Sequence, residues 1–236
     1  ISATIEAAMT PGAYIDDLQV DNWSIAAITP PKENTIISNT LRLNAGRGIS
    51  LKGASYTSIE ENLIERNQME GIYIANNSQH NTVRLNRIYE NVLYGIKLNG
   101  SDVQNNRLAR NSVARNLGGG IAVTGGANKA LALPVLEVGS IDLSRVQSDV
   151  PVGSWMIRGT TIPKGLVEIY SDSDQQALVY LGSTQADEKG IFEFVSKGQP
   201  WGLQITATVT DSAGNTSALS KVARNRLIPW LTSEHV

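Results

Sequence analysis

The dipeptide Gly-Ile occurs four times between residues 48 and 121, and successive copies are 23, 24 and 25 residues apart. An asparagine stands four residues before each of these glycines, and a second asparagine stands five residues before the first. A repeat of this length is typical of a stack of small structural units, because one unit alone cannot bury its apolar side chains. The repeat therefore constrains the fold of residues 34–128 more than any other feature.

Apolar residues keep the same phase as the glycines in every repeat. The columns are Ile36, Ile59, Val83, Leu108; Leu41, Ile64, Ile88, Val113; and Leu51, Ile74, Leu98, Val123. Apolar residues two positions apart, such as Ile49 and Leu51, have the period of a strand, and no helical stripe runs through this region. Each repeat is predicted to form three short strands, with equivalent side chains of successive repeats stacked at about 4.8 Å.

The asparagines form columns of their own. They are Asn39, Asn62, Asn86, Asn111; Asn44, Asn67, Asn91, Asn116; and, with one threonine, Asn34, Thr57, Asn81, Asn106. We expect turns at the asparagines and glycines, because both tolerate the left-handed backbone conformation. The stacked amides are expected to bond to one another and to backbone groups along the stack.

The pattern N-x4-N-x3-G-I-x-[ILV] resembles the repeat of right-handed parallel β-helix proteins of the pectate-lyase-like superfamily. The resemblance covers residues 34–128 and implies an all-β fold, with a right-handed parallel β-helix of four to five coils over residues 34–130. That superfamily contains polysaccharide lyases, glycoside hydrolases, epimerases, phage tailspikes and bacterial surface proteins. The resemblance thus implies a fold much more strongly than an activity.

Residues 1–33 are expected to form an N-terminal segment with one degenerate coil. Its register places Leu18 next to Leu41 and Ala26 next to Ile49, 23 residues apart. The chain begins Ile-Ser-Ala without a methionine, which suggests a piece of a larger protein. The N-terminal end of the stack needs a cover, because bare strand edges invite pairing. That cover can be this segment, further sequence or another subunit, so assembly with other subunits is one expectation.

The second half of the chain has another period. Alternating segments at residues 155–158, 166–170, 177–181, 191–195 and 203–209 are separated by Gly, Pro, Asp and Ser, as in a β-sandwich. Thr206 and Thr208 alternate with apolar residues, which predicts a half-buried antiparallel sheet. The stretches 205–217, 167–170 and 181–183 resemble bacterial immunoglobulin-like modules. We predict an immunoglobulin-like β-sandwich at residues 131–222, followed by a C-terminal tail at 223–236.

Composition excludes several classes of function. The chain has 20 Lys and Arg against 22 Asp and Glu, a formal charge of −2 and no basic block, so nucleic acid is not an expected partner. It has no cysteine and two histidines, which excludes thiolate zinc sites and cysteine nucleophiles. No apolar run is long enough for a transmembrane segment. The lack of cysteine agrees with a bacterial protein that is exported to the cell surface or the medium.

The outward positions beside the Gly-Ile strands carry the candidate site. Arg47, Glu70, Tyr73, Tyr94 and Lys97 are expected to form one aromatic and charged patch on neighbouring coils. Such a patch can stack on a sugar and hydrogen-bond to it, and the alternative is a merely solvated face. No two carboxylates stack there, so the sequence predicts no glycosidase pair. A lyase that uses Lys97 or Arg47 as the base against an acidic sugar stays an alternative, and no catalytic residue is assigned.

Three further features favour structural roles. The column Leu43, Arg66, Glu90, Arg115 alternates in charge, which predicts a ladder of ion pairs between coils. His80 is expected in a surface turn. Calcium is the one cofactor left open: Asp172 and Asp174, or Asp187 and Glu188, offer oxygen ligands, but neither pair belongs to a complete calcium loop, and turn formation is favoured. No other cofactor or metal is expected.

The leading interpretation is a non-enzymatic extracellular or cell-surface component with a structural or adhesive role, part of a larger protein or assembly. Its expected partners are polysaccharide or other surface proteins. The alternative is part of an extracellular polysaccharide lyase, glycoside hydrolase or epimerase.

Overall fold

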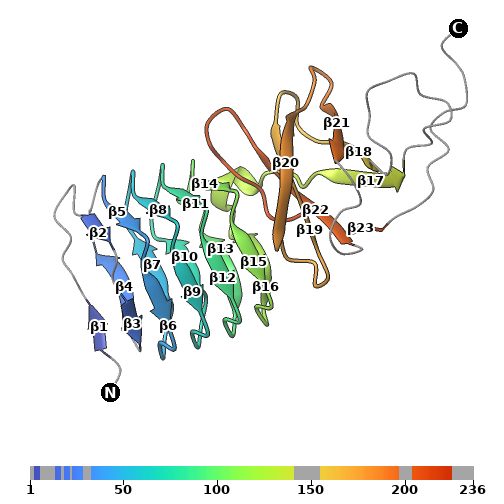
Figure 1. Cartoon of the computed structure of the whole chain (residues 1–236). Helices are drawn as coiled ribbons and strands as arrows, with labels where there is room; N and C mark the ends of the chain where they lie inside the picture. Colours follow the sequence, from blue (N-terminus) through green and yellow to red (C-terminus); the bar gives the residue numbers. More distant parts are fainter. Residues whose placement is uncertain are drawn as a thin grey trace, which may run out of the picture.

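The computed structural model describes residues 33–140, 155–196 and 204–224, with only the backbone described for residues 139, 140, 172 and 224. It also describes the backbone of four N-terminal strands, β1 (Ala3–Ile5), β2 (Tyr14–Asp16), β3 (Gln19–Asp21) and β4 (Trp23–Ile28). Most of the predicted C-terminal tail, residues 225–236, lies outside the described residues. The structure is all-β, with one short 3-10 helix at Ala127–Ala130 among the described residues (Figure 1).

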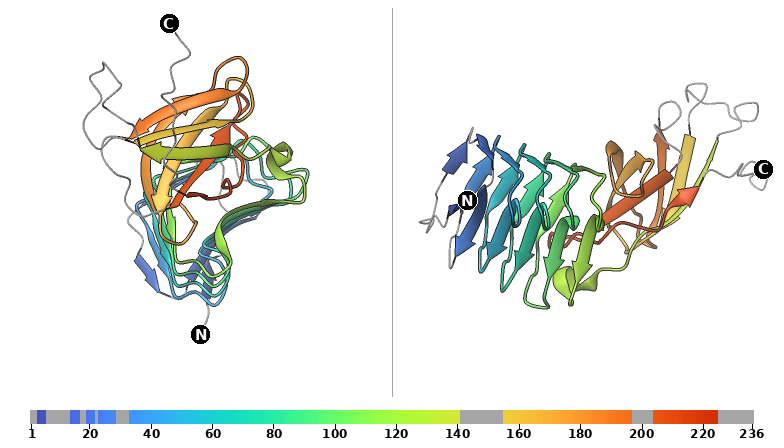
Figure 2. Two further views of the ribbon diagram at one scale, coloured as in Figure 1. Left: turned by 90° about the vertical axis from the view of Figure 1, so that its right-hand side faces the viewer. Right: turned by 90° about the horizontal axis from the view of Figure 1, so that it is seen from below.

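The first part of the chain is a solenoid with three strands per coil. The strands are β5 (Thr35–Ile37), β6 (Thr40–Arg42), β7 (Ile49–Lys52), β8 (Ser58–Glu60), β9 (Leu63–Glu65), β10 (Ile72–Ala75), β11 (Thr82–Arg84), β12 (Arg87–Tyr89), β13 (Tyr94–Asn99), β14 (Arg107–Ala109), β15 (Ser112–Ala114) and β16 (Gly119–Thr124). They form three parallel sheets. Sheet A has the order β1-β4-β7-β10-β13-β16, sheet B β14-β11-β8-β5-β2 and sheet C β15-β12-β9-β6-β3. Viewed along its axis, the stack shows the three sheets around one shared interior (Figure 2).

The predicted columns are confirmed. Ile64 pairs with Leu41 on one side and Ile88 on the other, and Ile88 pairs in turn with Val113. The interior side chains of all three sheets form one core cluster, in which members such as Ile49 and Ile72 are fully buried. Stacking of like side chains removes each of them from water, which is the main stabilising contribution in such a fold.

The N-terminal coil is present in backbone pairing, but its predicted register is wrong. Val20, and not Leu18, pairs with Leu41, and Ile25, and not Ala26, pairs with Ile49. The offset between coils is therefore 21 residues on sheet C and 24 residues on sheet A. A single spacing cannot align this coil, because its turns differ in length from those of the later coils.

The asparagine columns form the predicted ladders. Oδ1 of Asn67 accepts bonds from the backbone N and from Nδ2 of Asn44, at 3.1 and 2.6 Å. Nδ2 of Asn67 donates to Oδ1 of Asn91 at 2.8 Å and to the carbonyl oxygen of Leu41 at 3.2 Å. Asn62 and Asn86 are connected in the same way. These side chains are buried, and the ladder satisfies polar groups that the tight turns remove from water.

The turns themselves differ from the prediction. The left-handed residue is the one before each asparagine, for example Ser38 before Asn39 (φ 58°) and Glu61 before Asn62 (φ 55°). The asparagine stabilises this turn by a hydrogen bond across the left-handed residue: Nδ2 of Asn62 donates to the carbonyl oxygen of Glu60, two residues earlier, at 2.8 Å. The asparagine is therefore required because its side-chain amide makes buried hydrogen bonds. The left-handed position before it is occupied by many residue types.

The repeated glycines also serve a different purpose from the one predicted. Gly48, Gly71 and Gly95 do not have positive φ angles. Instead they lie where successive coils are closest: a Cβ atom at Gly71 would lie 2.7 Å from the carbonyl oxygen of Gly95 and 2.6 Å from Cγ2 of Ile88. The glycine leaves room for the next coil.

The second part of the chain contains two antiparallel sheets. One has the order β17-β18-β21, built from β17 (Val135–Ser140), β18 (Trp155–Thr160) and β21 (Ile191–Ser196). The other has the order β20-β19-β22-β23, built from β19 (Leu166–Asp172), β20 (Val179–Gln185), β22 (Gln204–Thr210) and β23 (Ala223–Arg224). Residues of both sheets, including Ile157, Ile169 and Phe192, share a second core cluster. The five predicted segments all correspond to strands.

The prediction of a half-buried sheet fails at β22, where Thr206 and Thr208 are 1% exposed. Their strand neighbours on the same face are Tyr170 and Glu168. Tyr170 belongs to the core cluster of the solenoid, and both residues contact the backbone N of Arg110. The polar face of this sheet therefore packs on the last coil and closes the C-terminal end of the solenoid (Figures 1 and 2).

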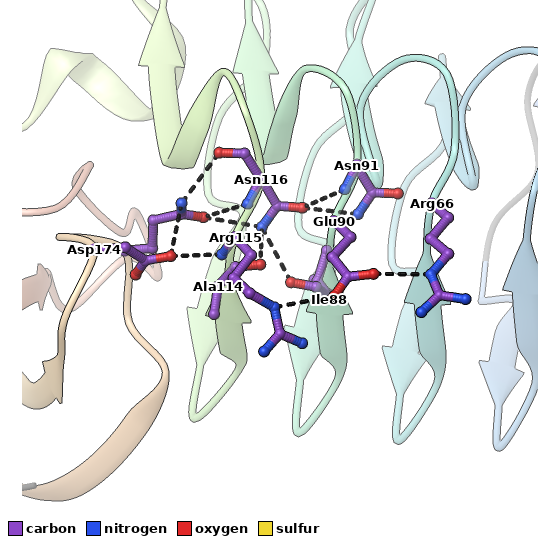
Figure 3. A network of polar contacts seen from close by, with 9 residues as sticks. Arg66, Ile88, Glu90, Asn91, Ala114, Arg115, Asn116 and Asp174 are labelled. Atoms are coloured by element: carbon purple, nitrogen blue, oxygen red, sulfur yellow. Dashed lines mark hydrogen bonds and ion pairs between the residues drawn. The ribbon is translucent and has the colours of Figure 1, made fainter.

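The second domain also continues the backbone bonding and the ladders of the solenoid. The backbone N of Val113 donates to the carbonyl oxygen of Ala177, and that of Leu108 donates to Oγ1 of Thr216. Oε1 of Gln176 accepts from the backbone N and from Nδ2 of Asn116, in the place of a further asparagine. Figure 3 shows this end of the ladder, with Asp174 beside Arg115. Edge groups that a bare last coil would expose are thus paired.

Tyr170 should make this junction sensitive to alkali. Burial and then the charge of Glu168 raise the pKa of Tyr170 well above its usual value of 10.0, and its hydroxyl donates to Glu168 at 2.6 Å. Above about pH 10 the unfolded tyrosine loses its proton while the folded one keeps it, so the free energy of unfolding falls as pH rises toward the folded pKa. We expect Tyr170→Phe to cost about 1 kcal/mol at neutral pH and to reduce the alkaline loss. Urea unfolding at pH 7 to 11 measures both effects, and equal alkaline slopes for the two proteins would contradict the assignment.

Candidate functional site

The five predicted site residues lie together on the outer face of sheet A. Tyr73 is paired with Lys97 in the parallel register of β10 and β13, and Tyr94 begins β13. Arg47 and Glu70 precede β7 and β10 at the equivalent position of two successive coils. The Gly-Ile strand turns Ile49 and Ile72 inward, and the alternation of the strand directs the residues between them outward. The structure therefore brings the five residues together, and their role in binding stays a prediction.

Glu70 is the centre of the patch. Its side chain is 2% exposed, and Oε2 accepts a bond from Nε of Arg47 at 2.8 Å. Nζ of Lys97 lies 3.8 Å from Oε1 of the same carboxylate. Two cations from the preceding and the following coil therefore hold one buried carboxylate between them, which offsets the desolvation of its charge.

The two tyrosines are oriented by the same cations. The guanidinium carbon of Arg47 lies 4.1 Å from the ring centre of Tyr73, and Nζ of Lys97 lies 5.6 Å from the ring centre of Tyr94. Each cation thus binds a carboxylate and a ring at once. We call these five residues, Arg47, Glu70, Tyr73, Tyr94 and Lys97, the sheet A network.

The network leaves several groups for a ligand. The side chains of Arg47, Tyr73, Tyr94 and Lys97 are half-buried, so their outer atoms reach solvent. The hydroxyl groups of both tyrosines make no hydrogen bond to any residue that the structure describes. Rigid rings surrounded by donors and acceptors are typical of surfaces that bind sugars.

The chemistry of a glycosidase has little support in this network. Hydrolysis by the usual mechanism needs two carboxyl groups about 5 to 10 Å apart. The sheet A network contains one carboxylate, Glu70, and both of its oxygens already face cations. The sheet A network therefore lacks the paired carboxyl groups of that mechanism.

The other sequence predictions can be placed as well. Glu90 pairs with Arg66 and Arg115 at 2.8 and 3.1 Å, which confirms the ladder of ion pairs (Figure 3). His80 lies in a turn with φ 57° and stacks on Tyr56, with ring centres 4.9 Å apart.

Of the residues considered for calcium, Asp174 and Asp187 have other contacts, and the side chain of Asp172 lies outside the described part of the chain. Oδ2 of Asp174 accepts from the backbone N of Arg115 at 2.6 Å. Oδ1 of Asp187 accepts from the backbone N of Lys189 and of Ile191, each at 2.8 Å, as a turn-forming aspartate does. Within residues 33–140, 155–196 and 204–224, no group of three or more acidic or histidine side chains is placed to hold a metal ion.

One surface feature was missed by the sequence analysis. A cavity of about 210 Å³ lies on sheet B at β11 and β14, and its lining residues are Thr82, Arg84, Leu85, Arg107, Ala109 and Arg110. The available signal was the column Glu60, Arg84, Ala109, in which a small residue follows a charged pair. Isolated arginines on outward positions are too common to single out without the structure.

Comparison with known proteins supports the fold. The family model described as the right handed beta helix region matches residues 20–133, which run from β3 to beyond the last solenoid strand, β16. No curated protein matches the sequence. Among the described residues, no helix has the length and apolar character to cross a membrane.

Among solved structures, the chain is similar to the enzymatically active domain of tailspike protein 2 of bacteriophage CBA120. The two are 12% identical, with a TM-score of 0.28 over 93% of this chain and 56% of that structure. The chain therefore spans little more than half the length of that domain, and a TM-score this low does not equate the two folds.

Proposed function

We propose that this protein is an exported, non-enzymatic β-helix component whose sheet A network binds polysaccharide. The observation that carries the proposal is the preformed set of contacts around Glu70, which spans three successive coils. Ordering the site before binding lowers the entropy cost of association. Because successive coils lie about 4.8 Å apart, the network also runs along the solenoid axis, in the direction that an extended chain of sugars would follow.

The second domain has a structural part in this proposal. We assign residues 131–222 to an immunoglobulin-like module on the basis of the sequence resemblance, and the two antiparallel sheets agree with that assignment. By closing the solenoid, the module would hold the coils of the sheet A network in place and connect them to the next part of the protein or to another surface protein.

Binding of neutral and acidic glycans on an array, followed by calorimetry with the best ligand, tests the proposal. We expect Tyr73→Ala to weaken binding about 10-fold, which corresponds to about 1.4 kcal/mol for one lost aromatic contact. Lys97→Ala should weaken binding as well, because the substitution removes a hydrogen-bond donor and leaves Oε1 of Glu70 without its cation. Tyr56→Ala is the matched control, since its ring is exposed and lies outside the sheet A network. If no glycan binds, or if both tyrosine variants lose affinity equally, the proposal is wrong.

The enzyme alternative is tested with the same polysaccharides by following chain length and new chain ends. Release of products by the wild-type protein, abolished in Glu70→Gln, would overturn the non-enzymatic part of the proposal. We expect binding without a change in chain length, because Glu70 has no second carboxylate beside it in the network.

A further inference from the structure

The cavity on sheet B is formed by an interruption in the column of charged residues. Along this column Glu60 faces Arg84, and Nη2 of Arg84 lies 2.5 Å from Oε2 of Glu60. On the next coil the position opposite Arg84 is Ala109, which is small and buried. Arg84 therefore has an acidic partner on one side and an open space on the other.

Two more arginines border this space. Arg107 is paired with Thr82 in the register of β11 and β14, and Arg110 follows β14 at a turn with φ 52°. Neither guanidinium forms an ion pair with any residue of the described chain. The guanidinium carbon of Arg110 lies 5.5 Å from the ring centre of Tyr180 in the second domain, which orients this side chain at the edge of the cavity.

The acidic groups near the cavity do not neutralise it. Glu60 is already bound to Arg84. Glu168 is 3% exposed, and its Oε2 accepts from the backbone N of Arg110 and from the hydroxyl of Tyr170. The exposed carboxylate of Glu61 also acts on Arg84 by its charge. Arg84, Arg107 and Arg110 therefore line the cavity, and Glu60 and Glu61 both act on Arg84.

We propose that this cavity is an oxyanion site, which binds a carboxylate, sulfate or phosphate group between Arg84, Arg107 and Arg110. Guanidinium groups form two parallel hydrogen bonds with such anions, and the hydroxyl of Thr82 is a further donor at the cavity wall. The free anion and the same group carried on an acidic polysaccharide share this chemistry. The site lies on sheet B, so it does not depend on the sheet A network or on its proposed function.

The arginine exchange Arg107→Gln tests the site, with Arg87→Gln as the matched control. Both residues are exposed arginines on outward strand positions, and Arg87 lies on β12 of sheet C, away from the cavity. Calorimetry at constant ionic strength measures inorganic sulfate, inorganic phosphate, a hexamer of galacturonate and, as a neutral probe, maltohexaose. Constant ionic strength is required because salt alone screens surface charges.

We expect saturable binding of at least one anionic probe and none of maltohexaose at this site. Arg107→Gln should weaken the anion about 10-fold or more, whereas Arg87→Gln should change its affinity less than 2-fold. Tighter binding of the hexamer than of sulfate and phosphate would identify a polysaccharide as the source of the anion, and the reverse order would identify a free anion. The absence of saturable anion binding, or an equal loss in both variants, would overturn the proposal. Anion binding that is retained in Tyr73→Ala would show that the anion binds at the cavity and not at the sheet A network, so the two proposals can fail independently.

Discussion

Replacing Gly71 with alanine is expected to lower the free energy of unfolding by about 3 kcal/mol or more, although only one methyl group is added. The new Cβ would lie 2.7 Å from the carbonyl oxygen of Gly95 and 2.6 Å from Cγ2 of Ile88. A backbone oxygen of the next coil cannot move away alone, because its strand is bonded on both sides. Relief of the clash would therefore separate two coils along sheet A.

Gly46→Ala is the control for this change. Gly46 lies in the same part of the solenoid, has no positive φ, and a Cβ there would have no neighbour within 4 Å. We expect Gly46→Ala to be neutral or slightly stabilising, since alanine restricts the unfolded chain more than glycine does. Denaturant unfolding followed by circular dichroism measures both variants. A loss below 1 kcal/mol for Gly71→Ala would show that the coils can separate at little cost, contrary to the packing described.

Asn67→Ala is expected to lower the free energy of unfolding by about 4 kcal/mol. The exchange removes four hydrogen bonds: two from Asn44, one to Asn91 and one to the carbonyl oxygen of Leu41. The partners remain buried without water, so the loss includes their desolvation and exceeds the usual contribution of about 1 kcal/mol per hydrogen bond.

Asn99→Ala provides the comparison. Asn99 is half-buried on the outer face of sheet A and accepts one bond, from Oγ1 of Thr124 at 2.9 Å. Its replacement should cost less than about 1 kcal/mol, because water can take the place of the lost side chain. Equal losses for Asn67→Ala and Asn99→Ala in the same unfolding experiment would mean that the ladder contributes no more than any exposed amide.

Much of the solenoid could be predicted from spacing. The columns that contain Ile64, Asn67 and Glu90 all recur with the period of the coil, so each residue meets its equivalent in the next coil. The sheet A network could be predicted for the same reason, since outward positions follow directly from inward ones.

The physical role of individual residues was harder to predict. Asparagine and glycine were both expected to occupy left-handed positions, because that is their usual use in turns. Here the left-handed position is occupied by residues such as Arg66 and Glu90. The asparagine is required because its amide is buried and hydrogen-bonded, and the glycine is required because successive coils are in close contact. The two roles, left-handed turn residue and residue in contact with the next coil, differ only in which residues lie nearby in the folded chain. A local sequence pattern does not contain that information.

The sequence by itself determined the coil, its interior and the face that carries the sheet A network, because each of these depends on contacts between equivalent positions of a regular repeat. The tertiary structure alone decided the register of the N-terminal coil, the burial of Thr206 and Thr208, and the cavity beside Arg107. These three depend on contacts between parts of the chain with different periods, or with none. Such contacts are set by how surfaces fit together, and no spacing along one segment encodes that fit.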